Sequence, residues 1–108
     1  MAPTLVPGDW VLAISVRMPR RGDVVVLEHP ARPGLEVVKR VRCVAGDVAP
    51  DGRVLGPDEV WVEGDDLERS TDSRHFGPVH RRMVRARVLF VYWPPARQRF
   101  VATGGVRA

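Results

Sequence analysis

Cysteine, lysine and long apolar runs are scarce in this chain. Its 108 residues include one cysteine, Cys43, so an internal disulfide framework and a cysteine-based metal site are excluded. No run approaches the roughly 18 apolar residues of a membrane span, and no basic leader precedes an apolar segment. The three histidines, His29, His75 and His80, lack the spacing of metal ligands. We therefore expect the given segment to be soluble and to use no metal or cofactor.

Helical periodicity of convincing length is also missing. Short β-branched runs separated by glycine and proline turns predict strands over residues 10–16, 24–27, 35–44, 53–55, 60–62 and 84–93. Residues 80–85 are compatible with one helical turn. The length and the 44% hydrophobic content allow one core. These features predict an all-β fold, a single small folded-sheet or barrel domain with little helix, in which residues 98–108 form a frayed tail.

Charge is distributed unevenly along the chain. Residues 1–68 contain 8 basic and 12 acidic groups, whereas residues 69–108 contain 9 basic groups and 1 acidic group. The arginines of the last third could bind nucleic acid or anionic lipid headgroups. An arginine-rich solvated face would give the same composition, and it is the simpler interpretation. The arginines concerned are Arg81, Arg82, Arg85, Arg87, Arg97, Arg99 and Arg107.

The only lysine, Lys39, lies in the middle of the predicted strand 35–44. Alternate residues of a strand share a face, so Lys39 shares its face with Val37, Val41 and Cys43. Burial among apolar neighbours disfavours the charged ammonium and lowers the pKa of a lysine. Lys39 is thus a candidate general base, although a lysine that reaches out to water from a half-buried strand would show the same pattern.

Residues 64–77 concentrate polar chemistry between two glycines. Ser70, Asp72, Ser73 and Arg74 lie within five positions, and side chains of these types bond to nearby backbone. Asp72 and Arg74 are spaced to form a charge-assisted pair that fixes the shape of the loop. On these residues alone, the segment is either a braced surface loop or one wall of a site.

Four segments of the chain form an ordered set of motifs. They are Met1-Ala2-Pro3-Thr4-Leu5, Arg21-Gly22-Asp23-Val24-Val25-Val26, Val38-Lys39-Arg40-Val41 with Gly46-Asp47 downstream, and Gly64-Asp65-Asp66 to Ser70-x-Asp72-Ser73-Arg74 with Phe76-Gly77-Pro78-Val79. In this order they resemble the motifs of the type I signal peptidase family, the S26 serine peptidases. Asp66 replaces the asparagine that is usual in the family. The resemblance covers residues 1–93, and four ordered motifs are much more specific than any one of them.

The resemblance implies a role for each matching residue. Lys39 would be the general base of a Ser/Lys dyad, and Ser70 would orient its amine. Asp72 and Arg74 would pair structurally, and Ser73 would pack near the site. The substrate would be a precursor protein or leader peptide, bound as an added extended strand and cleaved after a small residue.

The nucleophilic serine of the family would stand immediately before Met1, with Met1 and Pro3 beside it. We therefore expect the intact protein to carry this serine and a membrane anchor ahead of Met1, with an extracytoplasmic active site. The chain as given is expected to be inactive. The alternative is a non-catalytic peptide-binding domain of the same fold, and nucleic acid is not an expected partner.

The resemblance also suggests a domain division and a subgroup. Residues 1–95 would form the catalytic core, and residues 96–108 a flexible C-terminal tail. The short spacing between Lys39 and Trp61 excludes the large extra β-domain of long bacterial members. The chain is more similar to short members, of the mitochondrial inner membrane protease type or the nickel superoxide dismutase maturation protease type. The related self-cleaving repressors are a further possibility, but no helix-turn-helix pattern precedes this domain.

Overall fold

Seven strands and two short helical segments make up the part of the chain that the computed structural model describes, residues 10–16, 18–65, 71–93 and 99–100. The strands are β1 (Trp10–Ile14), β2 (Val24–Glu28), β3 (Glu36–Cys43), β4 (Glu59–Glu63), β5 (Val79–His80), β6 (Val84–Trp93) and β7 (Arg99–Phe100). The helical segments are α1 (Ser73–Phe76) and the 3₁₀ turn η1 (Arg81–Met83). The expectation of an all-β domain with little helix is confirmed.

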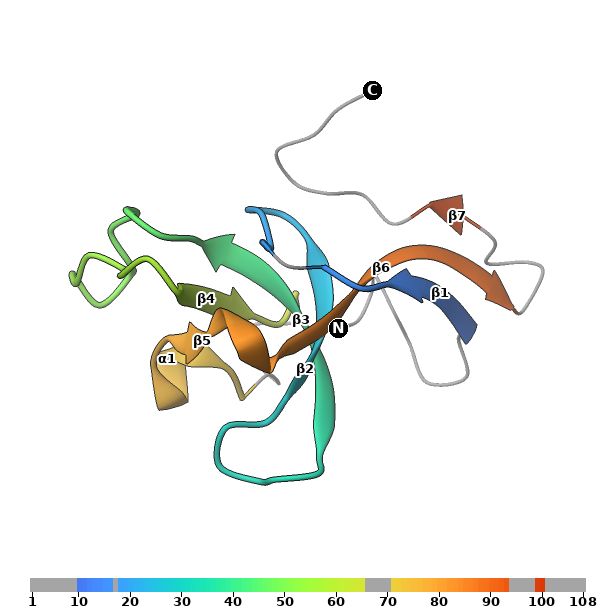
Figure 1. The fold of residues 1–108 in the computed structure, drawn as a ribbon, viewed down its shortest axis with the longest axis horizontal. Coiled ribbons are helices and arrows are strands. Elements are labelled where there is room, and N and C mark those ends of the chain that lie inside the picture. Colours follow the sequence, from blue (N-terminus) through green and yellow to red (C-terminus); the bar gives the residue numbers. More distant parts are fainter. Residues whose placement is uncertain (1–9, 17, 66–70, 94–98, 101–108) are drawn as a thin grey trace.

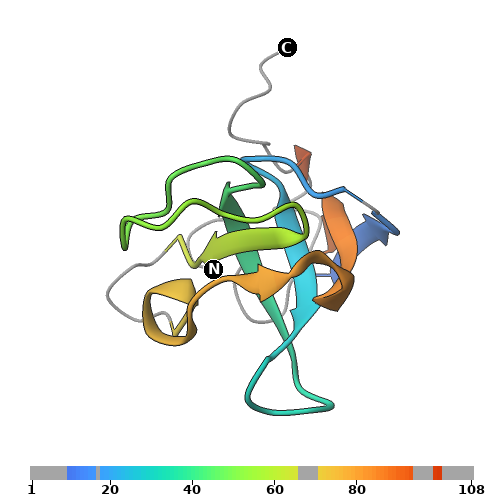
Figure 2. The ribbon, with the colours of Figure 1, turned by 60° about the vertical axis from the view of Figure 1, so that its left-hand side comes forward.

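The strands pair antiparallel in the order β1-β6-β2-β3-β4-β5, and β7 pairs with β6. The last long strand, β6, therefore lies between the first two, β1 and β2. Figure 1 shows β1 and β6 on one side of the molecule, with β4, β5 and α1 on the other. Seen from the second direction, the β2–β3 connection projects below the rest of the ribbon (Figure 2).

Beyond shifts of one or two residues at strand ends, the structure corrects or refines three predicted segments. The predicted strand over 53–55 is reduced to an isolated bridge between Val48 and Val54, because glycine and proline turns flank it closely. The helical turn considered for 80–85 is η1, and β6 follows it directly. Arg99 and Phe100 form β7 within the stretch expected to be a tail, whereas residues 94–98 and 101–108 lie outside the described residues.

Valines dominate the core because β-branched side chains pack well on a pleated, buried surface. The main cluster joins residues from β2, β3, β4, β5 and β6: Val25, Leu27, Val41, Val60, Val62, Val79 and Val84, each less than 7% exposed. A smaller cluster of Ala49, Leu55 and Trp61, with Cys43 packed against it, fills the β3–β4 connection. β3 borders both clusters, which fixes the strand that carries Lys39.

Candidate active site

Strands β2 and β3 place Lys39 on the core side of the sheet. Lys39 is the register partner of Val25, and directly opposed residues of antiparallel strands share a face. Val25 is fully buried, and so is Val41, two residues further along β3. The expected alternation holds for Val37, Lys39 and Val41, whereas Cys43 follows a register shift and packs against the second cluster. The half-buried Lys39 side chain lies among apolar neighbours.

The electrostatic surroundings of Lys39 favour its neutral form. Burial lowers the pKa of Lys39 from its ordinary value. The carboxylate of Asp72 opposes this shift, and the guanidinium of Arg74 adds to it. The start of α1 therefore lies within electrostatic reach of β3, and the net result is a lysine that loses its proton more readily than one in water.

Asp72 is the N-cap of α1, and its side chain is fully buried. One carboxylate oxygen accepts hydrogen bonds from the backbone N–H of Arg74 (3.1 Å) and from its Nε (2.9 Å). The other accepts from Arg74 Nη2 (3.0 Å) and from the backbone N–H of Gly64 (3.0 Å). Burial alone would raise the pKa of Asp72, but these hydrogen bonds outweigh it and hold that pKa below its usual value.

The capping box of α1 includes a histidine. His75 Nδ1 accepts a hydrogen bond from the backbone N–H of Asp72 (3.4 Å), while the Asp72 side chain caps the backbone of the first turn. The Asp72–Arg74 pair expected from the sequence is therefore present, and it serves a second purpose. The same carboxylate begins a four-residue helix, which the sequence did not predict because so short a helix has no periodicity.

Ser73 connects α1 to β4. Its side chain is 1% exposed, and its Oγ accepts a hydrogen bond from the backbone N–H of Val62 (2.9 Å). Val62 is the register partner of Val41 on β3. Because Asp72 also binds Gly64, two adjacent side chains hold the loop against the end of β4.

A second contact joins Arg40, the residue after Lys39, to the beginning of the same loop. Arg40 binds Asp65 in a bidentate arrangement, Nε to Oδ1 at 2.8 Å and Nη2 to Oδ2 at 3.0 Å. Arg40 Nη1 also donates to the carbonyl oxygen of Gly22 at 2.8 Å. The side chains of Arg40 and Asp65 are 11% and 14% exposed. Sequence analysis missed this contact, although both residues lie within the quoted motifs.

The structure thus brings together Lys39, Asp72, Ser73 and Arg74. Ser70, Met1 and Pro3 lie outside the described residues, and their roles stay predictions. Within the described ranges, no group of three or more His, Cys, Asp or Glu side chains is arranged to hold a metal ion. In the same ranges, no helix has the length and apolar character needed to cross a membrane.

Several arginines of the basic C-terminal third face acids from earlier in the chain. Arg81 pairs with Asp58 (2.8 Å), Arg85 with Glu28 (2.7 Å), and Arg87 lies 3.9 Å from Asp23. Arg97 and Arg107 lie outside the described residues. The charge asymmetry of the sequence is therefore partly cancelled by the fold, which weakens the case for an anion-binding face on these arginines.

Comparison with known families tests the resemblance found in the four motifs. The family described as signal peptidase, peptidase S26, matches residues 1–51 and 49–93. This chain belongs to the S26 signal peptidase family. The resemblance to the family is confirmed, and the matched residues include all four motifs.

Relatives of this S26 chain are proteases of the mitochondrial inner membrane. It is 34% identical over 107 residues to mitochondrial inner membrane protease subunit 1 of Mus musculus, covering 87% of this chain and 64% of the relative. It is 41% identical over 110 residues to mitochondrial ATP-independent inner membrane protease subunit 1b of Arabidopsis thaliana (87% and 65%). It is 33% identical over 115 residues to inner membrane protease subunit 2 of Saccharomyces cerevisiae (90% and 65%). The chain therefore spans just under two thirds of the length of these relatives.

Proposed function

We propose that this S26 chain is the catalytic core of a serine endopeptidase that removes N-terminal signal or leader peptides after small residues. The observation that carries the proposal is the placement of Lys39. It lies on the core face of β3 opposite a fully buried valine. The loop beside it is held by two contacts, Arg40 with Asp65 and Asp72 with Gly64. The family and the names of the relatives support peptide hydrolysis in general.

The chemistry requires a neutral amine. In its neutral form, Lys39 accepts the proton of a serine hydroxyl while the serine oxygen attacks the scissile carbonyl carbon. The tetrahedral intermediate collapses with cleavage of the C–N bond, and the lysine ammonium gives its proton to the departing amine. Water then hydrolyses the acyl-enzyme with the same lysine as base. The serine is the one that the resemblance implies immediately ahead of Met1.

The β-sheet offers a place for an extended substrate. β3 pairs with β2 from Glu36 onward, whereas its pairing with β4 begins only at Arg40. Among the described strands, residues 36–38 thus pair with β2 alone. An added strand along this edge would run directly past Lys39, as strand-addition binding requires.

The names of the relatives support a membrane location for the intact protein. Their names place them in the mitochondrial inner membrane. We propose that the intact protein is likewise membrane-associated, with its active site on the extracytoplasmic side. A precursor would then be cleaved after its leader has entered the membrane.

The test uses the chain extended at its N-terminus by the serine and assayed on an internally quenched peptide with an Ala-x-Ala site. We expect kcat/KM to rise with pH through the lowered pKa of Lys39. Lys39→Ala should reduce kcat at least about 100-fold, the usual contribution of a general base. Arg32→Ala, at an exposed position in the β2–β3 connection, is the control and should leave kcat unchanged.

Two results would redirect the proposal. Full turnover by Lys39→Ala would remove the dyad mechanism. If the serine-bearing chain binds the peptide without cleaving it, the alternative of a non-catalytic peptide-binding domain would be correct instead. The 108-residue chain without the added serine should bind but not hydrolyse the peptide.

A further inference from the structure

Asp23 closes the turn that leads into β2, and the proposed reaction gives this residue no role. One carboxylate oxygen, Oδ2, accepts a hydrogen bond from the backbone N–H of Arg20 at 2.9 Å. The backbone N–H of Asp23 donates to the carbonyl oxygen of Arg20 at 3.0 Å. Between them, Gly22 has a φ of 90°, a conformation that residues with a Cβ rarely adopt. Asp23 is 1% exposed, so a buried carboxylate holds this turn in one shape.

The turn binds Arg40, the residue that follows Lys39. The carbonyl oxygen of Gly22 accepts a hydrogen bond from Arg40 Nη1 at 2.8 Å. The N–H of Gly22 donates to the carbonyl oxygen of Val41 at 2.8 Å, so the turn also continues the pairing of β2 with β3. The other nitrogens of Arg40, Nε and Nη2, bind Asp65 at the beginning of the loop before α1. The guanidinium of Arg40 therefore connects the turn to this loop.

The second carboxylate oxygen of Asp23 faces β6. Arg87 Nη1 lies 3.9 Å from Asp23 Oδ1. Among the described residues, neither this oxygen nor Arg87 Nε has a hydrogen-bond partner, although both atoms are buried. A buried ion pair contributes to stability only when its geometry is good and its remaining polar atoms are hydrogen-bonded. The hydrogen bond that Asp23 makes within the turn is therefore its main contact, and Arg87 supplies a compensating charge.

We propose that Asp23 is a positioning residue for the Lys39 site. By closing the turn it fixes the carbonyl group of Gly22, which binds Arg40, and Arg40 sets how β3 lies against the loop before α1. Lys39 and Asp72 are on the two parts that Arg40 joins. Burial is the main cause of the lowered pKa of Lys39, so a looser connection admits water to the amine and raises that pKa. This inference rests on the proposed function, because it adds a residue that acts on the general base without touching the substrate.

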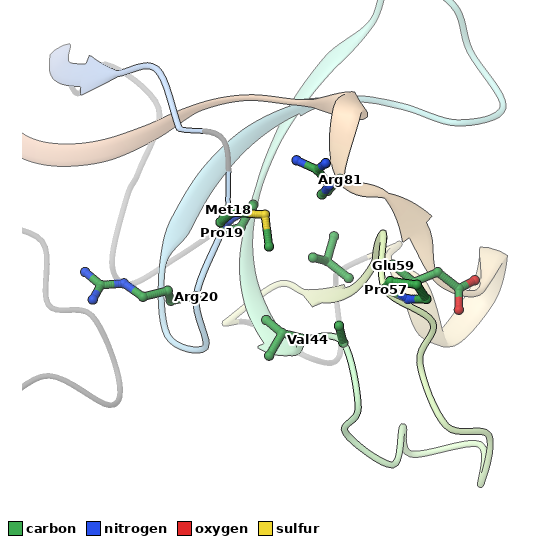
Figure 3. Close-up of a pocket in the computed structure, with 9 residues that line it drawn as sticks. Met18, Pro19, Arg20, Val44, Pro57, Glu59 and Arg81 are labelled. Atoms are coloured by element: carbon green, nitrogen blue, oxygen red, sulfur yellow. The ribbon is translucent and has the colours of Figure 1, made fainter.

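A second turn repeats this geometry and provides the matched control. Asp47 Oδ2 accepts from the backbone N–H of Val44 at 2.9 Å, and the N–H of Asp47 donates to the carbonyl oxygen of Val44 at 2.9 Å. Gly46, in the third position, has a φ of 85°. Val44 and Arg20, the first residues of the two turns, line the same apolar pocket of about 260 Å³, and the Arg20 side chain extends away from it (Figure 3). The N–H of Gly46, however, donates to Leu55 within the β3–β4 connection at 3.0 Å. Loss of the Asp47 carboxylate should thus loosen a neighbouring turn and leave the contact between β3 and the loop intact.

Lys39 is the only lysine of the chain, so its amine can be titrated alone. Lysine labelled with ¹³C at Cε gives one side-chain NMR signal, and this signal follows the Lys39 amine in the 108-residue chain as pH is raised. We expect Asp23→Ala to raise the pKa of Lys39 toward the unfolded value of about 10.4, and Asp47→Ala to leave it unchanged. In the serine-extended chain, Asp23→Ala should lower kcat about ten- to hundred-fold with little change in KM, as a small misplacement of reacting groups does. Circular dichroism and urea unfolding check that each variant is folded.

Two further variants test how Asp23 acts. Asp23→Asn keeps an acceptor oxygen for the N–H of Arg20, so Lys39 should titrate as in the natural chain. A purely electrostatic role of the carboxylate would instead make Asp23→Asn resemble Asp23→Ala. If the effect passes through Arg40, Asp23→Ala should change the Lys39 titration and kcat little when it is added to Arg40→Gln.

Several results would overturn the positioning role of Asp23. It is wrong if folded Asp23→Ala keeps the native Lys39 titration, or if Asp47→Ala shifts that titration as far. It is also wrong if the effects of Asp23→Ala and Arg40→Gln are independent of each other. Where Asp23→Ala does not fold, Asp23→Asn decides, and a raised pKa of Lys39 in that folded variant contradicts the role. The NMR titration needs neither the added serine nor cleavage, so an inactive peptidase and a failed positioning role give different results.

Discussion

Asp72→Asn tests whether the buried carboxylate, rather than the loop sequence in general, holds the candidate site together. The substitution keeps the size of the side chain but turns one acceptor oxygen into an N–H donor. In the native loop that oxygen accepts from Gly64 or Arg74, so a donor would face a donor in a fully buried position. Hydrogen bonds to charged groups contribute about 1.5–3 kcal/mol each.

We expect Asp72→Asn to lower the free energy of unfolding by about 3 kcal/mol. The estimate takes the loss of two charge-assisted hydrogen bonds and reduces it because Arg74, with 32% of its side chain exposed, can be rehydrated. Urea unfolding followed by circular dichroism measures the change. A loss of this size is a large fraction of the stability of a small domain.

The chain contains its own control for this experiment. Asp51 and Arg53 repeat the Asp-x-Arg spacing, and Arg53 donates from its backbone N–H (3.2 Å) and its Nε (2.8 Å) to Asp51. These side chains are 32% and 57% exposed. Asp51→Asn should therefore change the free energy of unfolding by less than about 1 kcal/mol. Equal effects of the two substitutions would show that burial of Asp72 is not what makes it important.

The pH dependence gives a second measurement on the same variant. The pKa of Asp72 in the folded chain lies below its unfolded value, so its contribution to stability is complete above the unfolded pKa of about 3.9. That contribution is lost as pH falls through the folded pKa. Asp72→Asn should consequently unfold with less acid dependence than the natural chain. An unchanged acid dependence would contradict the assignment.

Three further predictions concern Lys39, Arg40 and Ser73. Lys39→Met should raise the free energy of unfolding by about 1 kcal/mol at neutral pH, because a partly desolvated functional group is replaced by an apolar one. In the serine-extended chain it should also remove activity. The pKa of Lys39 is lower in the folded chain than in the unfolded chain, so the unfolded chain binds more protons between these two values. The free energy of unfolding therefore rises with pH in this range, up to the unfolded pKa of about 10.4. Lys39→Met should remove that slope in urea titrations at several pH values. Arg40→Lys should lower the free energy of unfolding by about 2 kcal/mol because a lysine cannot replace the bidentate contact to Asp65. Arg42→Lys is its control and should have little effect, because the contacts of Arg42 to acids are longer, 3.6 and 3.8 Å. Ser73→Ala should lower the free energy of unfolding by about 1–3 kcal/mol, because it leaves the buried N–H of Val62 without an acceptor. Hydrogen exchange at that amide should accelerate, and an unchanged exchange rate would refute the link between α1 and β4.

The sequence predicts the local features of the site better than its long-range contacts. Alternation along residues 35–44 is enough to place Lys39 and Val41 on one apolar face, because a strand has a period of two. Spacing alone also predicts the Asp72–Arg74 pair. Which residue lies opposite Lys39 depends on the pairing of β2 with β3, and no local pattern specifies that Val25 is the partner.

Contacts between motifs are the part that sequence reasoning could not supply. Arg40 and Asp65 are 25 residues apart, and each had an obvious explanation as an exposed charge. Net charge misleads for the same reason. The basic C-terminal third allowed an anion-binding face as well as the simpler solvated face, but antiparallel pairing sets Arg85 against Glu28, 57 residues earlier in the chain. A usable signal for the Arg40–Asp65 contact was that both residues lie in ordered motifs of one family.

The position of β6 between β1 and β2 has a consequence for the folding of the chain. Neither of the first two strands can complete its backbone hydrogen bonds until residues 84–93 are available, because β6 is the partner that they share. Pairing of this kind closes long loops, which is typical of proteins that fold in milliseconds to seconds. During synthesis, β1 would wait for its described partner and β2 would keep one exposed edge until β6 has left the ribosome. The β2–β3 and β3–β4 pairs around Lys39 do not involve β6 and can form earlier.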